Sequence, residues 1–146
     1  MLQGISKLLT GDLLKALCDM GHGDELVIAD ANFPGERIAR RLIRLPGVSG
    51  TELLRAIAPL IPLDSYSPAP ALVMQLTDSD RAKGMPNPVI WGEYEAILRQ
   101  HYGADARVNP IERYAFYERA QSAYLVIQTG EERIYGNLLL AKGVIV

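Results

Sequence analysis

Apolar residues in this chain follow two patterns that alternate along its length. In the first pattern they recur every three or four positions, as in residues 11–20, where Leu13, Leu17 and Met20 fall on one side of a helix and Thr10 is a typical N-cap. The same spacing, preceded by capping patterns at Ser49–Glu52 and Asn87–Pro88, predicts further helices. These helices cover residues 49–58, 88–102 and 112–121.

In the second pattern, short apolar segments without alternation contain β-branched residues, which is typical of strands buried on both faces of a sheet. They cover residues 26–29, 71–76 and 123–128, with shorter strands over 41–45, near Val108 and over 138–141. Residues 32–35 are predicted as a turn and 77–87 as a surface loop. Strands alternating with helices predict an α/β fold, a three-layer sandwich with a mostly parallel sheet flanked by helices. Without a linker or repeat, residues 1–146 are expected to form a single domain.

The composition agrees with one core and narrows the classes of function. The 146 residues are 49% hydrophobic and carry a formal charge of −2, with basic residues scattered along the chain. A nucleic-acid-binding surface would need a dense basic patch, and no segment reaches the roughly 20 apolar residues of a membrane span. Because no apolar leader segment is present either, we expect a cytoplasmic protein that binds neither nucleic acid nor membrane.

Two further apolar features lead to separate predictions. Cys18 is the only cysteine and lies among apolar residues of the first predicted helix, which favours a buried structural thiol. The chain ends in Val144-Ile145-Val146, and an apolar end of this kind is typical of a strand in a sheet or of a subunit interface.

Signatures of several large enzyme classes are missing from the sequence. It contains no GxGxxG or GxxxxGK[ST] segment for nucleotides, no GxSxG elbow, and no HExxH or CxxC spacing. The two histidines, His22 and His101, lie far apart in the chain, so we expect no metal site. These patterns alone predict an α/β domain with a polar site.

Polar residues near the ends of predicted strands are the candidates for that site, because α/β sheets bind ligands beyond the carboxyl ends of their strands. Asp30 ends the first buried strand, Asp64 precedes the second, and Tyr135-Gly136-Asn137 precedes the last. His22 lies between two glycines, which leaves its imidazole room to approach a ligand. The residues alone leave another interpretation open, in which His22 caps the preceding helix and the aspartates close turns.

Five blocks of the sequence, in this order, resemble the RbsD/FucU family. They are Met20–Glu25, Ala29–Pro34, Pro62–Tyr66, Glu112–Ala120 and Tyr135–Asn137. The resemblance spans nearly the whole chain. Within the family, ribose pyranases tend to carry histidine in place of Arg113 and alanine in place of Gly136, so these two residues indicate the L-fucose mutarotase branch.

The resemblance implies an isomerase that interconverts the α and β anomers of a free monosaccharide, L-fucose in this branch. It implies neither cofactor nor metal, and a homo-oligomeric ring, typically a decamer, with the pocket near a subunit boundary. His22 would then be the proton donor, with Asp30 holding the sugar and orienting His22 or acting as its partner. The remaining site residues would bind the sugar hydroxyls or line the pocket: Asp64, Arg113, Tyr117, Tyr135 and Asn137.

Three alternatives stay open at this point. The first is a D-ribose pyranase, which converts pyranose into furanose. The second is a non-catalytic sugar-binding partner of a transporter, which would bind a sugar without accelerating its anomer exchange. The third is a structural ring in which His22 only caps a helix.

Overall fold

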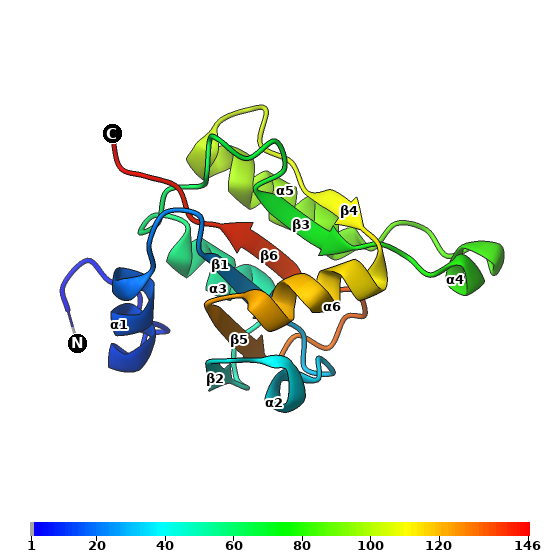
Figure 1. Cartoon of the computed structure of the whole chain (residues 1–146), viewed down its shortest axis with the longest axis horizontal. Helices are drawn as coiled ribbons and strands as arrows, with labels where there is room; N and C mark the ends of the chain where they lie inside the picture. Colours follow the sequence, from blue (N-terminus) through cyan, green and yellow to red (C-terminus); the bar gives the residue numbers. More distant parts are fainter. Residues whose placement is uncertain (1) are drawn as a thin grey trace.

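The computed structural model describes residues 2–146, which contain one six-stranded sheet with the order β2-β5-β1-β6-β3-β4 (Figure 1). The strands are β1 (Glu25–Ala29), β2 (Leu42–Leu45), β3 (Ala71–Met74), β4 (Asn109–Ile111), β5 (Leu125–Thr129) and β6 (Leu138–Ala141). The helices are α1 (Gly11–Asp19), α2 (Gly35–Ile38), α3 (Gly50–Ile57), α4 (Asp78–Ala82), α5 (Val89–Tyr102) and α6 (Arg113–Ser122).

The sheet is mostly parallel, as predicted. β1 pairs with β5, β2 with β5 and β3 with β4 in parallel, whereas β6 runs antiparallel to both of its neighbours, β1 and β3. A parallel connection needs a crossover of a dozen or more residues, usually with a helix. The segment between Thr129 and Leu138 contains no helix and is too short for such a crossover, so β6 enters the sheet in the opposite direction.

Helices cover both faces of the sheet and produce the predicted three layers. On one face, α1, α3 and α5 pack against side chains such as Leu26 and Ile28 of β1. On the other face, α6 and α2 pack against the alternate side chains Val27 and Ala29. Figure 1 shows α6 crossing the front of the sheet with α3 and α5 behind it. The four apolar positions of β1 are therefore buried on both faces, which explains their lack of alternation.

The structure corrects several local predictions. Residues 32–35 and 77–87, predicted as a turn and a loop, contribute to α2 and contain α4, and α4 buries none of its residues. Pro88 rather than Asn87 precedes α5, and it provides no side-chain cap. Hydrophobic periodicity cannot reveal a helix such as α4, because it has no buried face.

Two predictions about apolar residues are also wrong in part. Cys18 is exposed, because the buried stripe of α1 is formed by Leu13, Ala16 and Leu17 and Cys18 points away from it. Val144, Ile145 and Val146 lie outside every described strand and are exposed, so the prediction that they belong to a strand is wrong. No helix within residues 2–146 has the length and apolar character needed to cross a membrane.

Candidate active site

The first group of candidate residues lies where the chain enters β1. His22 occupies the turn between α1 and β1, and Gly23 beside it has a φ of +80°, a conformation that favours glycine. The Nε2 atom of His22 lies 3.2 Å from Oδ1 of Asp64, and the ring centroids of His22 and Tyr66 are 5.5 Å apart. The side chain of His22 is 46% exposed, so its imidazole is accessible from outside the chain.

Asp64 reaches His22 because its loop pairs with the end of β6. The backbone N–H of Asp64 donates to the carbonyl of Ala141, and Leu63 forms an antiparallel bridge with Lys142. The N–H of Tyr66 donates to Oδ1 of Asp64 at 3.0 Å. This hydrogen bond is the main cause that lowers the pKa of Asp64 below its ordinary value, and the contact with His22 adds to the effect. Asp64 is therefore an ionised partner for the imidazole.

The structure assigns the capping of α1 to a different residue from His22. The ammonium group of Lys142 donates hydrogen bonds to the carbonyls of Leu17 (3.1 Å) and Met20 (2.5 Å), at the end of the helix. A cation at this position also interacts favourably with the helix dipole. The side chain of His22 contacts Asp64 instead, so the interpretation of His22 as a helix cap is wrong.

The second group lies at the opposite end of β1, around Asp30. The amide of Asn137 binds Asp30 twice: its Nδ2 donates to Oδ2 (2.7 Å), and its Oδ1 accepts from the backbone N–H of Asp30 (2.9 Å). The N–H of Asn32 donates to Oδ1 of Asp30 at 3.0 Å. Asp30 and Asn137 are both 5% exposed, and burial raises the pKa of Asp30 although these hydrogen bonds act in the other direction.

A cleft of about 200 Å³ opens over Asp30. Pockets for drug-sized ligands measure about 300–1,000 Å³, so this cleft suits a smaller molecule. Arg113 and Tyr117, one turn apart on α6, form one wall, and the guanidinium lies 5.7 Å from the centroid of the tyrosine ring. The full set of lining residues is Asp30, Asn32, Phe33, Met74, Arg113, Tyr117, Ile134, Tyr135 and Asn137.

The turn that carries Tyr135 and Asn137 is supported from behind by α5. Tyr135 has a φ of +59°, which is uncommon for a bulky residue. Trp91 donates from its indole to the carbonyl of Tyr135, and the buried hydroxyl of Tyr94 donates to the carbonyl of Gly136. A Cβ atom on Gly136 would lie 2.9 Å from the carbonyl oxygen of Arg133, so the turn has no room for a side chain there.

Trp91 and Tyr94 support the site, although the apolar pattern of residues 88–102 predicts only a helix there. Both lie on the apolar stripe of their helix, and their hydrogen-bonding groups gave no separate signal in that pattern. The available signal was chemical: a buried tyrosine hydroxyl or tryptophan N–H usually finds a hydrogen-bond partner.

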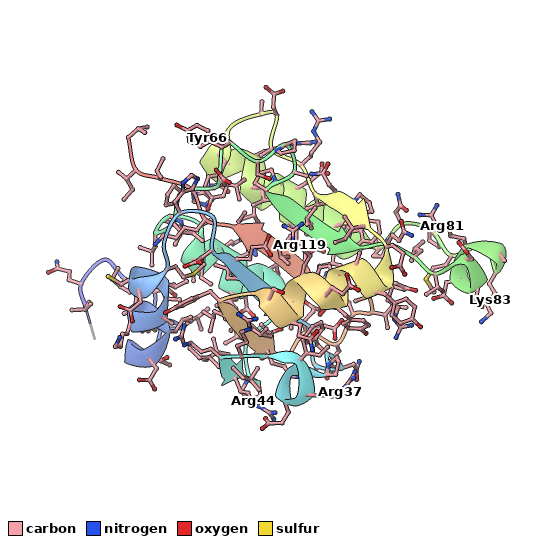
Figure 2. All side chains as sticks on the ribbon, in the orientation of Figure 1. Arg37, Arg44, Tyr66, Arg81, Lys83 and Arg119 are labelled. Atoms are coloured by element: carbon pink, nitrogen blue, oxygen red, sulfur yellow. The ribbon has the colours of Figure 1, made fainter. Side chains whose placement is uncertain are left out.

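The structure thus brings five of the predicted site residues together in the cleft and places the other two, His22 and Asp64, elsewhere. β1 separates the two groups, and its five residues span roughly 16 Å. In Figure 2 the labelled Tyr66, which lies beside His22, is far from the labelled Arg81 of α4. Asp30 therefore does not orient His22 of its own chain, and Asp64 occupies that position.

A metal centre has no obvious location in this arrangement. Within residues 2–146, no group of three or more histidine, cysteine, aspartate or glutamate side chains is placed to hold an ion. The side chains of Asp30 and Asp64 already contact other side chains, Asn137 and His22 respectively. The polar groups of both halves are thus suited to hydrogen bonding and proton transfer.

Comparison with known proteins gives full-length matches. The model of the RbsD / FucU transport protein family matches residues 3–145. The fucose mutarotases of Danio rerio and Homo sapiens are 50% and 48% identical to this chain, each over 99% of it and over 95% and 94% of their own lengths. The crystal structure of a fucose mutarotase from Streptococcus pneumoniae in complex with L-fucose superposes with a TM-score of 0.91 at 42% identity, covering 99% of this chain and 100% of that one.

These matches extend over all elements of the sheet and over both groups of polar residues, since they leave only the outermost positions of the chain unmatched. They agree with the five sequence blocks that first indicated the same relationship. The chain therefore belongs to the RbsD/FucU family.

Proposed function

We propose that this protein is an L-fucose mutarotase, an isomerase that interconverts the α and β anomers of the free sugar. The observation that carries the proposal is the full-length similarity to a fucose mutarotase whose structure contains L-fucose. The cleft over Asp30 supports it, because carboxylate, guanidinium, amide and phenol groups surround a space suited to a small polyhydroxylated molecule.

The chemistry needs a proton donor and an acceptor at the anomeric centre. Mutarotation breaks the bond between C1 and the ring oxygen, which must gain a proton, while the anomeric hydroxyl loses one. Histidine suits this exchange because its unperturbed charge change lies close to neutral pH. In our proposal His22 donates a proton to the ring oxygen as the ring opens, while the anomeric hydroxyl releases its proton to solvent water. The reverse transfers close the ring on either face.

Asp64 determines which nitrogen of His22 meets the sugar. Because the carboxylate of Asp64 is ionised, it accepts a hydrogen bond, and the Nε2 atom facing it carries a hydrogen. Nδ1 is then the atom that exchanges a proton with the substrate. Asp64 also stabilises the imidazolium form electrostatically, as an acidic partner does for a catalytic histidine in other enzymes.

The sugar itself binds in the cleft. Asp30 accepts hydrogen bonds from sugar hydroxyls, and Asn137 fixes the position of its carboxyl group. Arg113 donates to hydroxyl oxygens from the opposite wall, beside Tyr117. Tyr135 and Asn137 complete the polar lining, while Phe33 and Met74 provide apolar contacts for the carbon face of the ring.

We infer further that a complete active site forms between subunits, because one chain holds its proton donor and its sugar cleft at opposite ends of β1. The His22–Asp64 pair of one subunit would meet the cleft of its neighbour. Such a head-to-tail contact generates a ring when the rotation closes, which fits the expected homodecamer. Tyr66 lies beside His22, and Val144–Val146 follow Lys142, whose carbonyl accepts a hydrogen bond from the N–H of Gly23. These exposed apolar residues are suited to burial in this interface. A cytoplasmic location completes the proposal, since the single cysteine excludes an internal disulfide.

Exchange NMR on a panel of free sugars tests the function. With L-fucose, magnetisation transfer between the two anomeric protons should be much faster with the protein than without it. D-Ribose serves as the comparison sugar. Acceleration limited to the furanose signals of D-ribose would identify a pyranase instead, and saturable L-fucose binding without faster exchange would identify a sugar-binding partner of a transporter.

A further inference from the structure

Helix α4 projects from the body of the protein on the segment between β3 and α5 (Figure 1). It has five residues, and none of them is buried. One side chain of this helix nevertheless points back to the sugar cleft: Asp80 accepts a hydrogen bond from the hydroxyl of Tyr135, with Oη and Oδ2 2.5 Å apart. This contact joins a projecting segment to a residue that lines the cleft.

The hydroxyl of Tyr135 has few remaining ways to bind a ligand. Its one hydrogen is donated to Asp80, and one oxygen lone pair accepts the backbone N–H of Thr77 at 3.2 Å. A phenol has one donor and two acceptor positions, so a single lone pair stays free. Towards a sugar, Tyr135 can therefore act as an acceptor and not as a donor.

We propose that Asp80 is a positioning residue for the sugar cleft, which acts through Tyr135 by fixing its hydroxyl in place as a hydrogen-bond acceptor. The inference rests on the proposed function, because it assumes that the cleft binds the sugar. In this arrangement α4 holds a polar wall of the cleft from outside, and only Tyr135 touches the substrate.

The charge of Asp80 supports this direction of the hydrogen bond. Its contact with Tyr135 is the main cause that lowers the pKa of Asp80, and the positive charges of Lys83 and Arg113 add to it. An ionised carboxylate can only accept, so the shared hydrogen belongs to the tyrosine. Trp91 separately donates a hydrogen bond to the backbone carbonyl of Tyr135. Asp80 therefore fixes the position of the tyrosine hydroxyl rather than the conformation of the turn.

Four variants test the proposal, with the L-fucose dissociation constant and the anomer-exchange rate measured for each. Asp80→Ala should weaken L-fucose binding by about 3- to 30-fold, which lies within the usual range of coupling between residues in contact. Asp80→Asn keeps an oxygen that can accept from Tyr135 and should stay within about 3-fold of the wild type. Asp78→Ala removes the same charge from the same first turn of α4 and should leave binding unchanged.

The fourth variant, Tyr135→Phe, decides whether Asp80 acts through the tyrosine. Tyr135→Phe should weaken binding by itself, and adding Asp80→Ala to it should cause no further loss. An equal loss from Asp80→Ala in both backgrounds, a comparable loss from Asp78→Ala, or wild-type binding by Tyr135→Phe would each overturn the proposal. Wild-type protein that binds L-fucose without accelerating exchange would refute the mutarotase function alone, since the dissociation constants still decide the role of Asp80. Wild-type protein that neither binds L-fucose nor accelerates its anomer exchange would overturn both the mutarotase function and the role of Asp80.

Discussion

Asp30 and Asp64 make the same local contact in two different environments. Each accepts a hydrogen bond from the backbone N–H two residues further along the chain, at Asn32 and at Tyr66 respectively, both at 3.0 Å. Asp30 is enclosed with the amide of Asn137, and burial raises its pKa. Asp64 lies beside the half-exposed His22, and its hydrogen bonds lower its pKa. The same local turn is therefore compatible with opposite shifts of the carboxyl pKa.

The two aspartates have different roles in the two halves of the site. Asp64 stays charged at lower pH than an ordinary aspartate, so it can stabilise a protonated His22 throughout the range in which histidine titrates. Asp30 is held by neutral partners, which makes it suited to binding hydroxyl groups rather than a cation. Proton transfer and sugar binding thus depend on opposite ends of β1.

The largest effect is expected from removal of the proton donor. His22→Ala should lower the anomer-exchange rate of L-fucose by about 10²–10⁴-fold, the usual contribution of a positioned acid or base. The half-exposed imidazole supports little of the core, so the circular dichroism spectrum should not change. His101→Ala is the matched control, because this second histidine is exposed on α5 and does not line the cleft. Exchange within tenfold of the wild type in folded His22→Ala protein would refute the assignment.

The next prediction separates a site within one chain from a site between two chains. His22→Ala and Asp30→Ala proteins should each be nearly inactive. Co-expressed in equal amounts they should recover about a quarter of the wild-type exchange rate, which is the chance that an intact histidine meets an intact cleft across a head-to-tail contact. Exchange NMR on the purified mixed assembly measures this recovery.

A matched control for that experiment is co-expression of His22→Ala with Asp64→Ala. Both substitutions damage the same half of the site, so every interface in the mixture has one defective donor group, and recovery should be absent. Recovery in neither mixture would show that His22 and Asp30 serve the same chain's site, in contradiction to the composite arrangement.

The layers and the sugar cleft could be predicted from the sequence largely because they depend on strands. Leu26–Ala29 is apolar without alternation since both of its faces are covered, and Asp30 follows at the carboxyl end where α/β sheets bind ligands. Leu138–Ala141 was predicted with its correct bounds for the same reason. Family resemblance added Arg113 and Tyr117, which the hydrophobic pattern did not identify as site residues.

The pairing of His22 with Asp64 could not be predicted, because it depends on a contact between distant segments. The bridge between Leu63 and Lys142 places the Asp64 loop beside the start of β1, and nothing local in either segment encodes it. Helix α4 was missed because it buries no side chain, and with it the contact between Asp80 and Tyr135. Short polar helices and long-range polar pairs leave no periodic pattern in a sequence.

The smallest effect, and the most direct test of the comparison between the two aspartates, is the pH dependence of stability. The pKa of Asp64 is lowered by folding, so its contribution is present above the ordinary value of 3.8 and is lost as the pH falls through the lower folded value. The Tm advantage of the wild type over the Asp64→Asn variant should therefore shrink as the pH decreases from about 5 towards 3.

Asp30 should show the opposite sign. Because its pKa is raised by folding, ionisation favours the unfolded chain, and stability is lost as the pH rises from 3.8 through the higher folded value. The Tm of the wild type relative to the Asp30→Asn variant should therefore fall with rising pH, whereas the corresponding difference for Asp64→Asn rises. Thermal unfolding followed by circular dichroism between pH 3 and 7 measures both differences. Curves of the same sign would mean that the burial of Asp30 and the hydrogen bonds to Asp64 do not distinguish the two carboxyl groups.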